Sequence, residues 1–261
     1  MGSGGLLRQV SVGGLVMPGQ RANYAPDVWI AEAFDDWDDL ADAKGGLADR
    51  ALGHGSFAPA STNRSQLVAT LRCWCKASSQ AQLQQSRSRL KAVAATAGTV
   101  RVTVEREGEL RWREGRVGGI NLRDDRAEGY LTAEVDFVFP DPRLFGPAQP
   151  LASTGTYPRF RLDNQQGTAE GMYELTVTPQ AAVNRIVLTV DGQQLAVETP
   201  ITPGVPVEFF ADSGVVLVGG LFAQRVRGVW PSVPAGQVRQ LTVDGGGPTV
   251  SVAGNFYPAW W

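Results

Sequence analysis

The sequence predicts a mostly β protein with two domains, in which an α+β domain precedes an all-β sandwich of the jelly-roll type. The first observation is that only one segment, near residues 79–97, repeats its apolar residues with the helical period. The second is that alternation of apolar and polar residues, the pattern of half-buried strands, recurs over much of the remaining chain. Together these patterns predict one helix packed on an antiparallel sheet, followed by a domain built of strands alone.

The boundary between the two predicted domains follows a strand that ends at two prolines. Residues 130–139 alternate strictly, and Pro140 and Pro142 then remove two backbone donors, so the ladder cannot continue. Charged residues make up 36 of the first 148 residues but only 14 of the last 113, which supports a cut at this point. We therefore predict domains over residues 1–148 and 149–261.

The first predicted domain opens with a strand or hairpin over residues 5–17. A long irregular stretch follows over residues 24–60, where glycines and Pro59 interrupt any regular element. Such a stretch inside a compact domain is typical of a functional loop or an assembly arm.

Residues 65–76 alternate as a strand that carries Cys73 and Cys75 on one face. Metal sites usually need two residues between the cysteines and a second pair elsewhere, and the sequence offers neither. Neighbouring same-face positions of a strand also stand too far apart for a disulfide. We therefore expect two buried structural thiols.

The helix is predicted from its capping residues as well as its period. Ser79 is a suitable N-cap, and Gln82 three residues later completes a capping box. Gly98 is a natural C′ residue. The apolar stripe consists of Leu83, Leu90, Val93, Ala94 and Ala97. Alternation after the helix predicts further strands near residues 100–104, 109–113, 116–123 and 129–139.

The second domain shows alternation in eight short runs separated by turn residues, a spacing that favours a sandwich or jelly roll. Asp191 and Gly192 between two such runs form a strong signal for a two-residue hairpin. The runs are residues 157–164, 172–178, 185–190, 195–199, 206–211, 215–218, 237–243 and 249–252.

No constellation of residues predicts an enzyme, a cofactor site or a metal site. His54, the only histidine, lies between two glycines, and no G-x-S-x-G elbow or phosphate-binding glycine motif is present. The net charge of −2 gives no general footprint for nucleic acid. No apolar run approaches the roughly 20 residues that span a bilayer, and the N-terminus lacks signal-peptide features. We expect a non-enzymatic protein made in the cytoplasm, without membrane insertion.

Four carboxylates crowd into five positions at Asp35, Asp36, Asp38 and Asp39. Their mutual repulsion favours a solvated loop or an electrostatic surface role, and the spacing does not match a calcium-binding loop. Trp37 in their midst is expected either to anchor the loop or to meet a partner.

Aromatic residues gather at the C-terminus, where the chain ends in Trp260 and Trp261. Two terminal tryptophans need burial, either on their own sandwich or at an intersubunit contact, where aromatic residues are enriched. Aromatic platforms also bind sugars, which leaves a glycan contact open. The candidate interface or glycan-contact aromatics are Trp37, Trp230, Tyr257, Trp260 and Trp261.

The order of these segments resembles the distal tail proteins of long-tailed, non-contractile bacteriophages, over nearly the whole chain. The first half contributes an irregular arm and then Leu67–Lys76, Ser79–Gly98, Val100–Val104 and Tyr130–Phe139, which closes on a junction over residues 140–146. The second half contributes Phe160–Ala169 and turns at Pro203 with Gly204 and at residues 234–236. No single motif is diagnostic, and the resemblance rests on the order of the elements.

The resemblance implies a structural protein of the virion, at the phage tail tip. The first domain of the family forms a hexameric ring that continues the tail tube, and its galectin-like second domain projects outward. The implied partners are therefore further copies of the chain, the tail tube and tape-measure proteins, and the tail-tip hub and receptor-binding proteins. Residues 20–60 are a candidate for a ring contact, which in a six-fold ring joins two different patches.

DNA is expected to pass through the lumen of such a ring without specific binding. The carboxylates of residues 35, 36, 38 and 39 are candidates for the channel wall, because a negative wall repels phosphates. The alternative function is a carbohydrate-binding module that contacts host-surface glycans through Trp230, Tyr257 or Trp260 of the sandwich.

Overall fold

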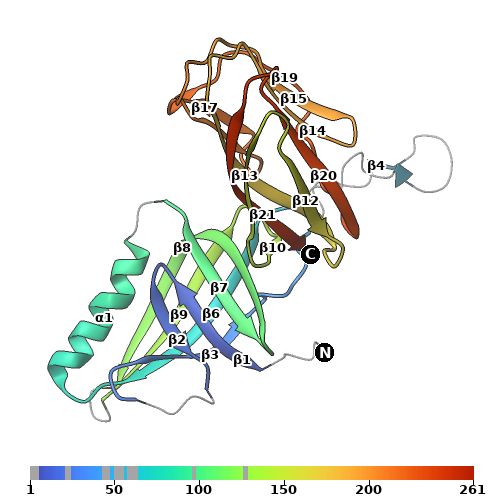
Figure 1. Cartoon of the computed structure of the whole chain (residues 1–261). Coiled ribbons are helices and arrows are strands. Elements are labelled where there is room, and N and C mark those ends of the chain that lie inside the picture. The colour runs from blue at the N-terminus through green and yellow to red at the C-terminus, as the bar shows by residue number, and fades with distance from the viewer. Residues whose placement is uncertain are drawn as a thin grey trace. The chain divides into compact units, whose positions relative to one another are not determined.

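The structure is a computed structural model, and it describes residues 6–20, 25–42, 48–49, 56–57, 64–95, 98–125 and 129–261. The chain divides into two compact units, residues 1–144 with residue 261, and residues 145–260 (Figure 1). The described residues contain one helix, and every strand pair whose register is known is antiparallel. This confirms the prediction of a mostly β protein with a helix in its first part.

In the first unit, seven strands follow one another as β2, β1, β7, β8, β9, β6 and β3. A parallel bridge between Gly19 and Ala31 joins the end of β2 back to β3 and closes the circuit. A Cβ at Gly19 would lie 2.0 Å from the carbonyl oxygen of Leu7, so this close approach requires glycine. The strands are β1 (Leu7–Val12), β2 (Leu15–Pro18), β3 (Trp29–Asp35), β6 (Leu67–Lys76), β7 (Val100–Arg106), β8 (Glu109–Asp125) and β9 (Tyr130–Phe139), with β4 (Ala48–Asp49) and β5 (Ser56–Phe57) pairing separately.

The helix α1 (Gln80–Ala94) packs against β8, β2 and β9. The hydroxyl of Ser79 accepts a hydrogen bond from the backbone N–H of Gln82 at 3.3 Å, which confirms the predicted N-cap. Leu83 and Leu90 of the predicted stripe are buried. The helix ends earlier than predicted, with its C-cap at Ala95 rather than at the residue before Gly98.

Two predictions for the first unit were wrong in detail. Residues 29–35, predicted to be irregular, form β3, because a bulge between Ala31 and Ala33 breaks the alternation that reveals a strand. Residues 109–123 form one continuous strand rather than two. An irregularity between Val117 and Gly119 bends this strand without ending it.

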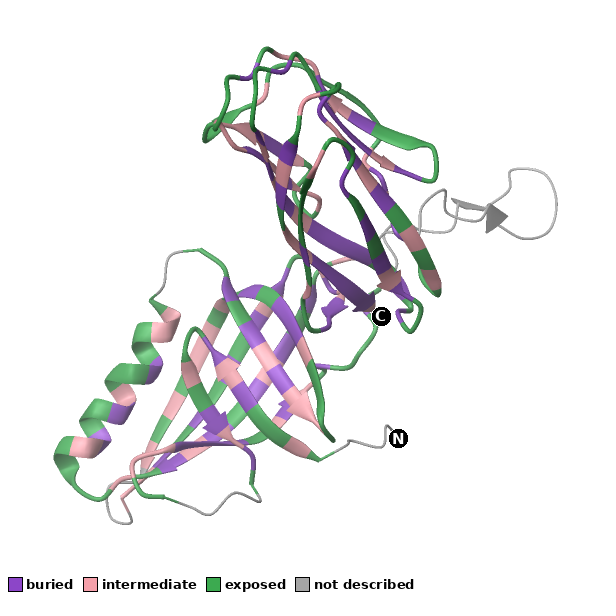
Figure 2. Cartoon of the chain, in the orientation of Figure 1, coloured by how far each residue is buried: buried purple, intermediate pink, exposed green. Residues whose placement is uncertain are grey.

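In the second unit, two sheets share one hydrophobic core. Both sheets contribute to it, for example Leu188 and Leu241 from one and Phe209 and Val252 from the other. Figure 2 shows the alternation of buried and exposed residues along these strands. The first sheet runs β12 (Arg159–Asn164), β20 (Gln237–Asp244), β14 (Ile186–Val190), β15 (Gln193–Val197) and β19 (Val226–Gly228). The second runs β18 (Leu221–Phe222), β17 (Val215–Val218), β16 (Val207–Phe210), β13 (Ala169–Pro179), β21 (Val250–Trp260) and β11 (Gln149–Gly155), and β10 (Leu144–Phe145) lies at the boundary between the units.

Each of the eight predicted runs coincides with a strand, and the predicted hairpin at Asp191 and Gly192 joins β14 to β15. Their φ angles of 46° and 81° are the left-handed values that such a turn requires. The last strand, however, continues to Trp260 instead of stopping near residue 252. Pro258 is tolerated in it because it lies opposite the irregularity between Ala169 and Met172, where the regular ladder is already interrupted.

Candidate functional site

One sheet of the first unit turns a face of charged and polar side chains outward. On β6 and β9 alternate residues are buried, so the remaining residues point away from the core. The register places Arg72 opposite Glu134, and Glu134 opposite Asn121 on β8. We call this surface the polar sheet face, and it comprises Asp35, Thr70, Arg72, Asn121, Arg123, Thr132, Glu134 and Asp136.

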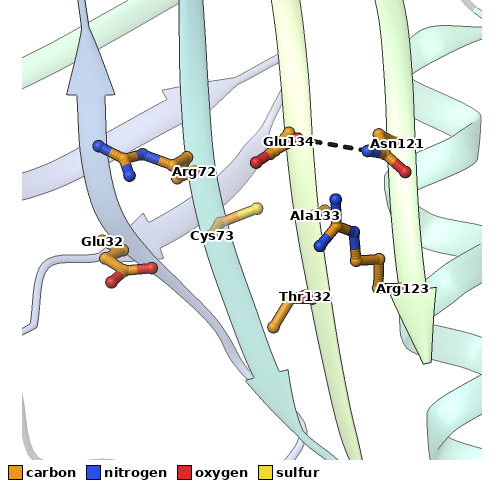
Figure 3. Close-up of a pocket in the computed structure, with 8 residues that line it drawn as sticks. All are labelled: Glu32, Arg72, Cys73, Asn121, Arg123, Thr132, Ala133 and Glu134. Atoms are coloured by element: carbon orange, nitrogen blue, oxygen red, sulfur yellow. Dashed lines mark hydrogen bonds between the residues drawn. The ribbon is translucent and has the colours of Figure 1, made fainter. Parts of the chain in front are cut away.

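A pocket of about 90 Å³ opens on the polar sheet face (Figure 3). Glu32, carried by the bulge of β3, and Glu134 supply two carboxylates, while Arg72 and Arg123 supply two guanidinium groups. Asn121 Nδ2 donates a hydrogen bond to Glu134 Oε2 at 3.3 Å. Pockets for small molecules usually measure about 300–1,000 Å³. The pocket therefore suits a few waters or one polar side chain rather than a substrate.

Cys73 lines this pocket, yet its side chain offers no chemistry. The residue is only 2 % exposed, and burial raises the pKa of its thiol to about 12. Since the thiolate is the nucleophilic form, the thiol stays protonated and inert at neutral pH. Cys75 is also buried, and its thiol lies 3.6 Å from Ser86 Oγ. The expectation of two buried, unpaired cysteines is confirmed.

The four predicted acidic residues divide into paired and unpaired carboxylates. The Asp35 carboxylate accepts a hydrogen bond from Arg72, whose Nε lies 2.9 Å from Asp35 Oδ2. This hydrogen bond raises the pKa of Arg72. Asp38 pairs with Arg106. Asp36 and Asp39 are exposed and form no ion pair within the described part of the chain. Half of the predicted negative cluster is thus neutralised by arginines of neighbouring strands.

Trp37 is a core residue, with only 1 % of its surface exposed. Its ring lies 4.8 Å from that of Phe34 and 5.6 Å from that of Phe139. The backbone carbonyl of Trp37 accepts a hydrogen bond from the fully buried Arg113, whose guanidinium also lies 5.1 Å from the Trp37 ring. Of the two roles predicted for Trp37, the structure supports the anchor of the acidic loop, because a buried ring cannot contact a partner.

The predicted aromatic residues of the second half do not form one platform. Tyr257 is 5 % exposed, and Trp230 is half-buried with its ring 6.4 Å from that of the buried Tyr173. Trp260 is half-buried on β21. Trp261 is 37 % exposed, and the guanidinium of Arg64 lies 5.4 Å from its ring. Only Trp261 of this set presents a large exposed ring.

The remaining candidates for chemistry are the single histidine and groups of metal-ligating side chains. His54 lies outside the described residues. No group of His, Cys, Asp or Glu side chains in the described part could hold a metal ion. Among the described helices none is long and apolar enough to cross a membrane.

Three features were missed from the sequence. The buried Arg113 occupies an inward position of β8, and burial lowers the pKa of its guanidinium to about 10. Asn164 is fully buried and joins three segments of the second unit through its amide. Exposed apolar residues gather over residues 221–229. Strand alternation misleads at Arg113, because the apolar Leu110 and Trp112 occupy the positions that predict the inward face, and periodicity gives no signal for the other two features.

Comparison with known proteins gave matches at the level of structure alone. No family model matches the sequence, and no curated protein matches it. The structure is similar to that of SPP1 Dit (gp 19.1), described as a paradigm of the hub adsorption apparatus in phages that infect Gram-positive bacteria. The TM-score is 0.61 at 14 % sequence identity, over 95 % of this chain and 98 % of that chain.

Two structures of the phage P2 baseplate in its activated conformation, with Ca and with Sr, also contain similar chains. Each gives a TM-score of 0.52 at 7 % identity, covering 90 % and 95 % of this chain respectively and 97 % of the matched chain. At such low identities the likeness shows the fold. The resemblance to distal tail proteins is therefore confirmed for the fold, over both units of the chain.

Proposed function

We propose that this chain is a structural tail-tip protein of a long-tailed bacteriophage, located in the virion and not acting as an enzyme. Its first unit assembles into a hexameric ring that joins the tail tube to the baseplate, and DNA passes through the lumen. Its second unit is a galectin-like sandwich that faces the host-recognition proteins. Further tail proteins, including the tube and tape-measure proteins, are the expected neighbours.

One observation carries this proposal: the likeness to the SPP1 hub protein covers 95 % of this chain and 98 % of that chain. A match that included one unit alone would support a shared building block, whereas this match includes both units in their chain order. The inert Cys73 and the small, charge-balanced pocket support a role without catalysis.

A ring requires contact surfaces rather than an active site. The polar sheet face and the segment over residues 20–60 are the candidates on the first unit. A polar face with both signs of charge suits a contact between copies, since such complementarity fixes register more than it adds affinity. In a six-fold ring the face would meet a different patch on its neighbour.

The acidic residues 35, 36, 38 and 39 belong to this proposal as the channel wall. Asp36 and Asp39 carry the argument, because their carboxylates are exposed and unpaired within the described residues. A six-fold map that placed Asp36 and Asp39 on the outer rim of the ring would refute this part of the proposal.

The mass of the full-length protein in solution tests the ring. Light scattering after gel filtration should give six times the chain mass of 27.9 kDa, with six-fold rings in negative-stain images. A monomer over the whole accessible concentration range, with no rings on the grid, would contradict self-assembly.

Carbohydrate binding by the second unit is the alternative proposal, and the burial of Tyr257 and the packing of Trp230 weigh against it. Glycan-array binding by the full-length protein, lost on Trp260→Ala but kept on Trp37→Phe, would favour it over a purely structural role.

A further inference from the structure

The second unit carries a concentration of exposed apolar side chains along one rim. Leu221 and Phe222 are 75 % and 76 % exposed, and Val226 and Val229 are 37 % and 63 % exposed. We call these four residues the apolar rim. Leu221 and Phe222 are the two most exposed large apolar side chains of the described residues, and the whole apolar rim lies within nine consecutive positions. Single exposed apolar residues are normal, but such a cluster marks an interaction surface.

The rim coincides with the end strands of both sheets. β18 ends one sheet and β19 ends the other, and every residue of these two strands is exposed. Figure 1 shows β17 and β19 at the end of the second unit that lies away from β10, and Figure 2 shows exposed residues along this end. All other strands whose burial is described contain buried or half-buried residues.

The backbone of β19 leaves hydrogen-bonding groups on its open side. The N–H of Glu198 donates to the carbonyl of Arg225 at 2.9 Å, and the N–H of Val229 donates to the carbonyl of Gln194 at 2.8 Å. Because bonded pairs alternate in an antiparallel ladder, the N–H and C=O of Val226 point away from β15. Among the described strands β19 has a neighbour on one side only.

The charge around this edge is positive. Arg225 and Arg227 are exposed, and residues 219–230 contain no carboxylate. Glu198, which directly follows β15, pairs with Arg227 at 3.2 Å, and this leaves Arg225 without a carboxylate partner in the described chain. The strand β19 and the residues beside it therefore combine three features. They are open backbone groups, exposed apolar side chains and the guanidinium of Arg225, which has no carboxylate partner in the described chain.

We propose that the open edge of β19 accepts an extended segment of a partner protein as an added strand, and that this segment alternates apolar and acidic residues. Main-chain hydrogen bonds to Val226 would anchor it, as in other cases of strand addition. Its apolar side chains would cover Val226, and its carboxylates, which point to the other face of the sheet, would pair with Arg225. The proposal goes beyond ring formation, because it concerns the second unit alone.

A second copy of the chain fits this edge poorly. Antiparallel pairing of β19 with its own copy about Arg227 would place Arg227 opposite itself, and like charges directly opposite are destabilising. A membrane surface fits poorly as well. A single basic residue attracts an anionic surface only weakly, and Arg227 is already paired with Glu198.

The test uses the full-length protein and a fluorescein-labelled heptapeptide of alternating glutamate and valine. Fluorescence anisotropy should show saturable binding to the unaltered protein. Val226→Pro removes the outward N–H while sparing the bonds to β15, so binding should weaken about tenfold or more. Val226→Ala is the matched control, because it trims the side chain but keeps the N–H, and its affinity should stay within about threefold.

A second variant tests the charge preference without touching the backbone. Arg225→Glu should weaken binding of the glutamate peptide and favour a matching lysine–valine peptide. Three outcomes would overturn the proposal: no binding of the glutamate peptide, equal binding by Val226→Pro with a preserved circular dichroism spectrum, or binding to phosphatidylserine vesicles that Arg225→Glu abolishes. If Val226→Pro lowered the mass of the assembly in solution, the edge of β19 would bind a second copy of the chain, and the proposal of a partner segment would be wrong. Ring formation is measured separately by mass, so its failure would leave these results interpretable.

Discussion

Replacing Asn164 by alanine should cost the second unit several kcal/mol, because its amide joins segments that are far apart in sequence. Asn164 Nδ2 donates to the carbonyls of Ala169 at 2.8 Å, Val233 at 3.1 Å and Pro234 at 3.1 Å. Its Oδ1 accepts from the N–H of Ala259 at 3.1 Å. The side chain is fully buried, so water cannot replace these bonds without a rearrangement.

The magnitude follows from the groups that the alanine leaves behind. The amide has two protons for three carbonyls, so one proton is shared and the truncation removes about three effective hydrogen bonds. Each buried group left unsatisfied costs about 1–3 kcal/mol, and carbonyls with a second partner cost least. We therefore expect Asn164→Ala to lower the free energy of unfolding by about 3–5 kcal/mol.

Urea denaturation followed by tryptophan fluorescence and by circular dichroism measures this loss, with the two units analysed as separate transitions. Asn121→Ala is the matched control, because its amide makes one exposed hydrogen bond of 3.3 Å and should cost less than about 0.5 kcal/mol. Asn164→Asp should be as damaging at neutral pH, since a carboxylate would face three carbonyl oxygens. Burial would raise the pKa of that carboxyl, so its stability should recover as the pH falls. A loss for Asn164→Ala no larger than that for Asn121→Ala would refute the reasoning.

Two further predictions rest on single features. The native protein should not react with Ellman's reagent at pH 8, while both thiols should react in urea. The raised pKa of Cys73 also predicts a pH dependence of stability. The stabilising contribution of the protonated Cys73 thiol is intact below about pH 9 and is lost as the pH rises towards about 12. Rapid labelling of the folded protein would show that burial does not protect the thiols. Gly228→Ala should destabilise the second unit by about 2 kcal/mol or more, because its Cβ would meet the Gln194 carbonyl oxygen at 2.1 Å with φ at +103°. Gly204→Ala, with φ at +79° and open space around it, should cost only about 1 kcal/mol, and equal losses for the two variants would exclude the steric cause.

Much of the fold could be predicted because its strands alternate cleanly. Tyr130–Phe139 alternates throughout in its burial and, apart from Tyr130 and Val138, in its sequence, and Ser79 caps the helix as expected. The prediction was wrong where local geometry departs from the ideal period. The bulge of β3 concealed a strand, and the early end of α1 at Ala94 left Gly98 without its expected role.

The candidate site could be predicted only in part, because pairing across strands depends on register. The sequence predicts four crowded carboxylates, but it cannot reveal that Arg72 and Arg106 neutralise two of them. The sequence leaves Trp37 either as the anchor of the acidic loop or as a partner contact, and only the neighbouring Arg113 and Phe139 identify it as the anchor. The open edge of β19 likewise emerges only when the order of the strands is known.

The circuit of strands that the bridge between Gly19 and Ala31 closes determines when the first unit can complete its fold during synthesis. This circuit also needs Val10 beside Val104 and Leu67 beside Phe139, so its first strand pairs with a segment made about ninety residues later. Because translation proceeds at about 5–20 residues per second, β1 lacks its partner β7 for several seconds after β1 and β2 have been synthesised. The open edges of these strands are an aggregation hazard during that interval. Chaperone dependence of the nascent chain should therefore end once residue 139 has left the exit tunnel.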